Sequence, residues 1–152
     1  MKKSAGIMLF RKNGTQLEVF LVHPGGPFWK NKDAGSWSIP KGEFTDEEPL
    51  SAALREFKEE TGQDLTGKPI ELTPIRQKGG KWVYAWGFEG NIDAEKIISN
   101  SFQMEWPYKS GKWQIFPEVD KAGWFNIQMA RIKINSGQAA LLDDLVSRVM
   151  MT

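Results

Sequence analysis

The sequence predicts an α+β or α/β fold in which a mixed sheet lies between helices. Three observations predict it. Short runs rich in branched and aromatic residues recur in both halves of the chain, as expected for strands. A central helix is predicted over residues 47–61. A second helix is predicted over residues 134–150, at the end of the chain. The chain has 152 residues, of which 40% are hydrophobic. A chain of this size buries a core of its own, and we expect one domain over residues 1–152.

The first half of the chain predicts a hairpin. Residues 4–11 and 17–22 are mostly apolar, and Asn13-Gly14 between them is a turn signal. A loop rich in Gly and Pro follows, and a short strand at residues 37–39 leads toward the central helix. We expect the lone histidine, His23, to be structural.

The second half predicts another hairpin, formed by residues 70–77 and 81–89 around a Lys-Gly-Gly turn. Residues 100–113 are expected to form a long loop, and residues 124–126 a short strand. In the closing helix Asn135 or Ser136 is the expected cap. The residues expected on its buried side are Ala140, Leu141, Leu145 and Val149.

Local signals define both ends of the central helix. Asp46 can cap its start, where Glu47 and Glu48 complement the positive end of the helix dipole. Pro49 is tolerated in the first turn, and Gly62 supplies the left-handed residue that commonly ends a helix.

This helix separates an apolar stripe from an acidic face. The residues expected to face the core are Leu50, Ala53, Leu54, Phe57 and Thr61. Glu56, Glu59 and Glu60 fall on another face, and Arg55 lies one turn before Glu59 and can pair with it. Like charges one turn apart cost roughly 0.2–0.5 kcal/mol unless a cation binds between them. Because Mg²⁺ and Mn²⁺ prefer oxygen ligands, this face is a candidate metal site, and an ordinary solvated face is the alternative.

The segment from Pro40 to Gly62, PKGEFTDEEPLSAALREFKEETG, resembles the Nudix box. The residues that match its second half, R-E-U-x-E-E-x-G, are Arg55, Glu56, Phe57, Glu59, Glu60 and Gly62. The usual spacing is G-x5-E-x7-R, and one residue is missing between Gly42 and Arg55, so either Glu47 or Glu48 fills the first acidic position. The last apolar position of the box is the polar Gln63.

The chain as a whole is similar to a bacterial subgroup of Nudix hydrolases described as predicted nucleotide pyrophosphohydrolases. This likeness involves residues 23–43, Glu105-Trp-Pro and the segment 117–120. The Pro40-Lys41-Gly42 form of the box also resembles the branch that cleaves dinucleoside polyphosphates. The resemblance implies an α/β/α sandwich with a central mixed sheet and a metal-binding helix after a glycine loop.

The resemblance also implies an activity. It is the hydrolysis, dependent on Mg²⁺ or Mn²⁺, of a diphosphate linkage in a nucleoside polyphosphate or dinucleoside polyphosphate, by attack of water at phosphorus. The implied metal ligands are Glu56, Glu59, Glu60 and the backbone carbonyl of Lys41. Arg55 would orient a glutamate by ion pairing, and Glu59 or Glu60 would be the general base.

Nudix enzymes often add an acid from a distant loop, and Glu105 is our candidate, with Glu118 and Asp120 as rivals. Candidate substrate-binding residues are Lys30, Trp37, Trp106 and Lys112, because they lie in or beside predicted loops. An exposed Trp can stack on a base and a loop Lys can contact phosphate. The alternative for each is ordinary packing or solvation.

Composition narrows the class of function. Twenty Lys and Arg residues against 19 Asp and Glu residues give a net charge of +1, which argues against an extended nucleic-acid surface and against an mRNA-end hydrolase. The absence of Cys excludes thiolate ligands and disulfides. No apolar run approaches the length of about 20 residues that a membrane-spanning helix needs, and no signal peptide is evident. We therefore expect a cytoplasmic protein without a membrane partner, and a homodimer is possible. The alternative to an enzyme is a non-catalytic nucleotide-sensing or protein-interaction module on the same fold.

Overall fold

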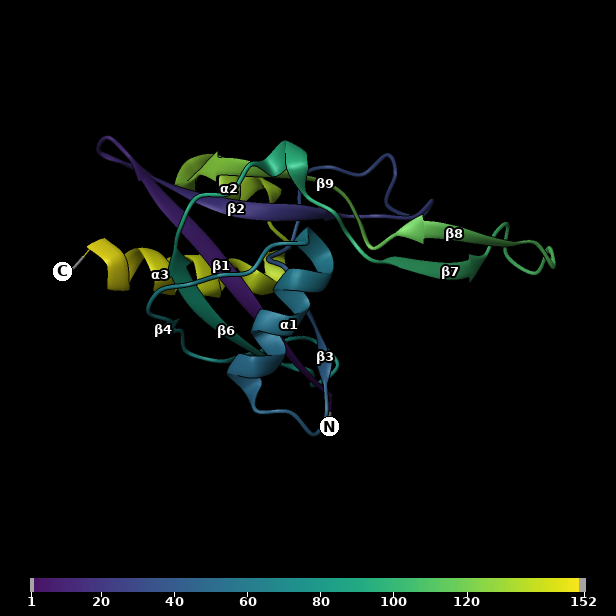
Figure 1. Ribbon diagram of the computed structural model, residues 1–152, viewed down its shortest axis with the longest axis horizontal. Helices are drawn as coiled ribbons and strands as arrows, with labels where there is room; N and C mark the ends of the chain where they lie inside the picture. Colours follow the sequence, from purple (N-terminus) through teal and green to yellow (C-terminus); the bar gives the residue numbers. More distant parts are fainter. Residues whose placement is uncertain (1, 151–152) are drawn as a thin grey trace.

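The computed structural model describes residues 2–150, and its centre is a mixed sheet (Figure 1). The described residues contribute seven strands to this sheet. They are β1 (Lys3–Asn13), β2 (Gln16–Pro24), β3 (Lys41–Phe44), β4 (Ile70–Glu71), β5 (Ile75–Arg76), β6 (Trp82–Glu89) and β9 (Val119–Asn126). The strand order is β4-β6-β1-β2-β9, with β3 paired to β1 and β5 paired to β6.

Strand β1 organises the sheet. It runs parallel to β6 from Lys3 to Phe10, whereas its pairings with β2 and β3 are antiparallel. Residues 3–6 of β1 pair with β3, and residues 10–13 pair with β2. On its antiparallel side, β1 therefore changes partner along its length, from β3 to β2. This change of partner places Lys41 and Gly42 beside the start of β1.

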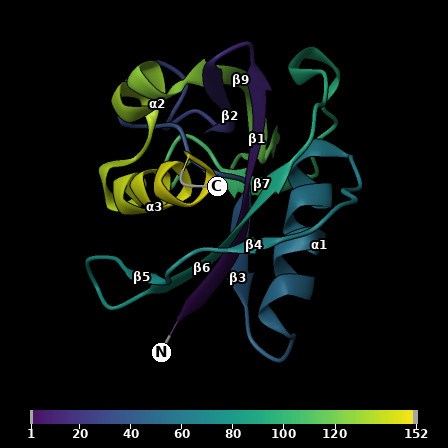
Figure 2. The same ribbon diagram turned by 90° about the vertical axis from the view of Figure 1, so that its left-hand side faces the viewer.

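Helices cover both faces of the sheet, as Figure 2 shows. Helix α1 (Pro49–Thr61) lies on one face, and α2 (Ile127–Lys133) and α3 (Ala139–Met150) lie on the other. Two apolar cores result. Phe57 of α1 packs with Phe20 in the first, and Leu141 and Leu145 of α3 fill the second. The expected mixed sheet between helices is confirmed. Within residues 2–150, no helix is both long enough and apolar enough to span a bilayer.

Two predicted strands differ from the structure. The strand expected at 70–77 is broken into β4 and β5, because Pro74 has no N–H and the Thr73 N–H donates to the Asp144 carboxylate of α3, at 2.7 Å. Residues 37 and 38 form only isolated bridges, and the strand that leads to α1 is β3.

The prediction of a long loop over residues 100–113 was wrong. Strands β7 (Ser101–Glu105) and β8 (Trp113–Pro117) form a separate hairpin that projects from the body of the molecule (Figure 1). Apolar residues alternate with polar ones along β7, which is the signal that could have predicted this strand. A 3-10 turn, η1 (Ala94–Lys96), precedes this hairpin.

The last part of the chain contains more helices and turns than expected. Strand β9 is longer than residues 124–126, helix α2 was not predicted, and a 3-10 turn, η2 (Ser136–Gln138), precedes α3. Asn135 caps η2 rather than α3, and its side chain accepts from the Gly137 N–H at 2.8 Å. Ala140 is exposed and Leu142 is buried in its place. The buried stripe of α3 contains Leu141, Leu142, Leu145 and Val149, which lie on one helix face, and Ala140 falls outside it.

Candidate active site

Helix α1 begins with an N-cap that the sequence did not single out. The Glu48 carboxylate accepts from the backbone N–H groups of Leu50 and Ser51, at 3.4 and 3.2 Å. The expectation that Asp46 caps the helix was wrong. Pro49 holds the first helical position and favours extended backbone at the residue before it, so that Glu48, with φ −66° and ψ 135°, becomes the cap. Gly62 ends the helix in the left-handed conformation, as predicted.

We expect Glu48→Ala to destabilise the protein by about 0.5–2 kcal/mol, because two backbone donors at the start of α1 lose their acceptor. Unfolding in urea measures the change, and Glu48→Asp is the control that keeps a capping carboxylate. The assignment of the cap would be wrong if Glu48→Ala unfolded at the same urea concentration as the wild type.

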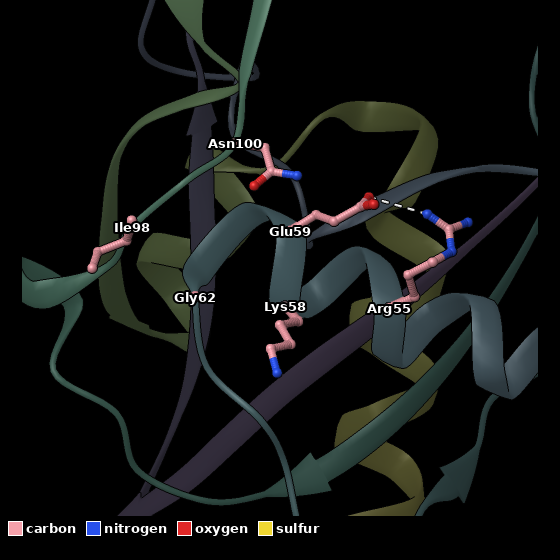
Figure 3. A pocket seen from close by; sticks show the side chains of 6 residues that line it. All are labelled: Arg55, Lys58, Glu59, Gly62, Ile98 and Asn100. Carbon is pink, nitrogen blue, oxygen red and sulfur yellow. Dashed lines mark hydrogen bonds and ion pairs between the residues drawn. The ribbon is translucent and has the colours of Figure 1, made fainter.

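Arg55 joins three glutamates. Its Nη2 lies 2.6 Å from Glu47 Oε1, and its Nη1 lies 3.0 Å from Glu56 Oε1 and 3.1 Å from Glu59 Oε2. The predicted pairing of Arg55 with Glu59 is confirmed, and Figure 3 shows the two side chains turned toward each other. The hydrogen bond to Glu47 is the largest cause of a raised Arg55 pKa, which keeps the guanidinium charged. Glu47 is therefore the acid that pairs with the arginine of the box, while Glu48 caps the helix.

Glu56 lies against Gly42 of β3. The Glu56 residue is only 9% exposed, and a Cβ added at Gly42 would stand 2.0 Å from Glu56 Oε2. Only glycine at position 42 leaves room for this carboxylate. Burial raises the pKa of Glu56, and the neighbouring Glu59 raises it further, while the hydrogen bond from Arg55 acts in the opposite direction.

Glu60 contacts the next residue of the same strand. Its carboxylate accepts a hydrogen bond from the backbone N–H of Lys41. Burial raises the Glu60 pKa well above its usual value, and the charges of Glu56 and Glu118 add to the shift. The half-buried Lys41 side chain is close enough to oppose it, and burial lowers the pKa of that ammonium group.

Glu118, between β8 and β9, supplies the fourth carboxylate. Its backbone N–H donates to the carbonyl of Asn100 at 2.8 Å, and the Asn100 N–H donates to the carbonyl of Glu59 at 2.7 Å. Burial raises the Glu118 pKa, and the charge of Glu59 raises it further. The structure therefore brings Glu118 to the three glutamates of α1. We call these four residues, Glu56, Glu59, Glu60 and Glu118, the glutamate cluster.

Glu105 does not belong to the glutamate cluster, contrary to our expectation. It is the last residue of β7, where it pairs with Trp113, and its carboxylate accepts from the Gly111 N–H at 2.9 Å. Asn100 lies beside α1, and an extended strand advances about 3.3 Å per residue, so Glu105 lies roughly 16 Å further along the hairpin. The sequence did not reveal the distance of Glu105 from α1, because residues 100–113 were expected to form a loop over the site.

Asp120, the other rival, is an exposed residue that bonds to a buried histidine. Its Oδ1 lies 2.8 Å from Nδ1 of the fully buried His23, whose Nε2 lies 2.6 Å from the Lys32 carbonyl oxygen. These two contacts anchor the loop after β2 to β9. His23 thus has the structural surroundings that we expected.

The four candidate substrate-binding residues do not lie together in the structure. Trp37 is 6% exposed, its ring meets those of His23 and Phe125, and its N–H donates to Asp33 at 2.8 Å. It lies in the core because residues 37–38 form bridges to β2 and to residue 134, so it offers no free face to a base. Lys112 is exposed near the outer end of the hairpin.

Lys30 and Trp106 do lie together. They line a groove of about 420 Å³ between the loop after β2 and the β7–β8 hairpin. Gln114, Phe116, Pro117 and Asp120 also line this groove. A second cavity, of about 400 Å³, adjoins the exposed side of α1 (Figure 3). Arg55, Glu59 and Asn100 are among its lining residues.

The glutamate cluster suits a hard divalent cation in its donor chemistry. Within residues 2–150, no three Asp, Glu or His side chains stand close enough together to hold a metal ion, and Arg55 Nη1 lies between Glu56 and Glu59. All the donors are carboxylate oxygens, the ligands that Mg²⁺ and Mn²⁺ prefer. Burial and mutual repulsion raise the pKa values of Glu56, Glu60 and Glu118, a cost that a cation would offset.

Comparison with known proteins identifies the family. The model of the NUDIX domain matches residues 1–145. Among solved structures, a Caenorhabditis elegans Ap4A hydrolase in a binary complex aligns over 100% of both chains, with 20% identity and a TM-score of 0.66. The NUDIX domain of Shewanella oneidensis NrtR, complexed with ADP ribose, aligns over 97% of this chain and 87% of that one, with 18% identity and a TM-score of 0.65.

A mutT/nudix family protein from Listeria innocua is also similar, with 18% identity over 99% of this chain and 94% of that one, and a TM-score of 0.64. At these identities the structural likenesses show the fold alone. No curated protein sequence matches the chain. The family match covers most of the chain, including the box and the glutamate cluster, so the protein belongs to the Nudix family and, at the level of that family, is a hydrolase of pyrophosphate bonds.

Proposed function

We propose that the protein hydrolyses a diphosphate linkage in a nucleoside polyphosphate or a dinucleoside polyphosphate, in a reaction that depends on Mg²⁺ or Mn²⁺. The observation that carries this proposal is the glutamate cluster, in which three carboxylates of α1 and that of Glu118, between β8 and β9, act on one another through their charges, with Glu56 against Gly42. Such a concentration of negative charge is unfavourable without a cation, and a diphosphate supplies further oxygen ligands to that cation.

In this proposal Glu56, Glu59 and Glu60 hold the metal together with the carbonyl of Lys41. The N–H of Lys41 already points to Glu60, and the N–H and C=O of one residue in an extended strand point to the same side. The bound cation would neutralise charge on the diphosphate and lower the pKa of a coordinated water.

The remaining side chains have positioning and proton-transfer roles. Arg55, held by Glu47, fixes the carboxylates of Glu56 and Glu59 by ion pairs of 3.0 and 3.1 Å. Glu118 takes the role that we first assigned to Glu105, as the acid from outside the box. The general base is Glu59, Glu60 or Glu118, because each is a carboxylate of the glutamate cluster that can accept a proton from the attacking water.

The similar structures support this class of substrate. One is an Ap4A hydrolase, and another is complexed with ADP ribose. Ap4A and ADP ribose each join a nucleoside to another group through linked phosphates. A cytoplasmic location and a homodimer remain part of the proposal.

A non-catalytic nucleotide-sensing module is the second candidate. Two observations favour it. Arg55 lies between Glu56 and Glu59, and within residues 2–150 no three acidic or histidine side chains are already placed to bind a metal ion. This candidate predicts that nucleotides bind without turnover.

A substrate screen tests the two candidates. Nucleoside triphosphates, dinucleoside polyphosphates and nucleotide sugars are incubated with the protein and Mg²⁺ or Mn²⁺, and ¹⁸O-labelled water shows which phosphorus is attacked. We expect metal-dependent turnover that Glu59→Gln lowers by about 10²-fold or more. Glu71→Gln, which removes an exposed acid of β4, is the matched control. Turnover that is undiminished in Glu59→Gln and Glu60→Gln would refute the proposed site, and binding without turnover of any substrate would favour the sensing module.

A further inference from the structure

The groove between the loop after β2 and the β7–β8 hairpin is next to the glutamate cluster. Pro117, the last residue of β8, lines the groove, and the following residue, Glu118, belongs to the glutamate cluster. The loop packs tightly here, since a Cβ added at Gly25 would lie 1.9 Å from the Pro117 carbonyl oxygen. A molecule in the groove therefore lies next to the proposed active site.

Trp106 offers this groove an aromatic surface. Within residues 2–150 its indole has no ring contact, cation–π contact or hydrogen bond, whereas the rings of Trp37 and Trp124 are already packed and their N–H groups already donate. The backbone of Trp106 is fixed, because its N–H donates to the Lys112 carbonyl and its own carbonyl accepts from Gln114 Nε2, both at 2.9 Å. Phe116 adds a second apolar wall.

Two charged side chains complete the groove. Asp120 Oδ1 is held by His23, and Oδ2 has no partner within residues 2–150, so it can accept a hydrogen bond from a ligand N–H. Lys30 forms no ion pair among the same residues, which leaves its ammonium group available to a carbonyl or ring nitrogen. The groove thus combines an aromatic surface with one acceptor and one donor, and these are the features that bind the face and the edge of a nucleobase.

We propose that this groove binds the purine base of the nucleotide substrate, with the base stacked on Trp106 and its edge between Lys30 and Asp120. The inference rests on the proposed function for the phosphate end of the substrate. A purine is favoured over a pyrimidine because two fused rings cover more of the indole than one ring does.

Nucleoside binding tests this inference without any chemistry. Adenosine, guanosine, uridine and ribose are titrated into the protein in EDTA, and the indole ¹H–¹⁵N signals are followed by NMR. We expect both purine nucleosides to bind at least about 10-fold more tightly than uridine, and ribose not to bind. Trp106→Ala should weaken purine binding by about 10-fold or more, and Trp106→Phe should retain part of it.

Trp113→Ala is the matched control. Trp113 belongs to the same hairpin, is 62% exposed and is not among the residues lining the groove, so its removal should leave purine binding unchanged. Equal binding of uridine and purines, or unchanged purine binding in a folded Trp106→Ala protein, would overturn the inference. Because the titration requires neither metal nor turnover, its failure is distinguishable from failure of the proposed hydrolysis.

Discussion

Replacement of Glu60 by Gln is expected to abolish hydrolysis and, in the same protein, to stabilise the metal-free fold at pH 8. Loss of activity follows if Glu60 binds the metal or accepts a proton, and we expect kcat to fall by about 10²- to 10⁴-fold. The gain in stability has a separate cause. Burial and the charges of Glu56 and Glu118 raise the Glu60 pKa in the folded protein well above its usual value of 4.5.

The sign of the pH dependence follows from proton binding. Between pH 4.5 and the raised pKa of the folded state, the folded protein holds a proton at Glu60 that the unfolded chain has lost. The free energy of unfolding therefore falls as the pH rises through this range. Gln resembles the protonated acid and removes this contribution. The stability gain of Glu60→Gln in EDTA should thus grow from pH 5 to pH 8.

Thermal unfolding at several pH values measures this effect. Mn²⁺ should raise the melting temperature of the wild type more at pH 8 than at pH 5, since it binds the ionised carboxylates, and it should raise that of Glu60→Gln much less. Glu71→Gln, at an exposed acid, should show neither change. A metal-free Glu60→Gln protein that is less stable than the wild type at pH 8 would show that the Glu60 charge does not oppose folding.

Gly42→Ala is expected to lower activity by about 10²-fold while the protein stays folded. The added Cβ would stand 2.0 Å from Glu56 Oε2 and 2.1 Å from Glu56 Cδ, so the carboxylate must move. Gly42 does not have the positive φ that disfavours other residues, and the clashing atoms are at the end of a flexible side chain. The protein can therefore fold with the added methyl group, but the Glu56 carboxylate must leave its present position.

A double-mutant cycle tests this explanation. The cost of Gly42→Ala in urea unfolding should be smaller in a Glu56→Ala background, where the carboxylate is absent. Activity and Mn²⁺ binding of Gly42→Ala alone report the displaced carboxylate. An equal cost in both backgrounds would show that the methyl group disturbs the β1–β3 pairing rather than Glu56.

The sequence by itself determined helix α1 and what lies on it. The 3.6-residue period places Phe57 in the core and brings Arg55 to Glu59, and Gly62 ends the helix through its own backbone preference. These features depend on residues that are close together in the chain. The same local reasoning failed at the first turn, because the effect of Pro49 on Glu48 outweighed the general preference for Asp as a cap.

Only the tertiary structure decided which distant residues complete the site. The pairing of β3 with β1 brings Gly42 and Lys41 to Glu56 and Glu60, and the projection of the β7–β8 hairpin carries Glu105 away while Glu118 stays beside α1. Burial of Trp37 likewise results from contacts with β2 and residue 134. The physical reason is that strand register and loop packing depend on contacts between segments far apart in sequence, which periodicity along a single segment does not encode.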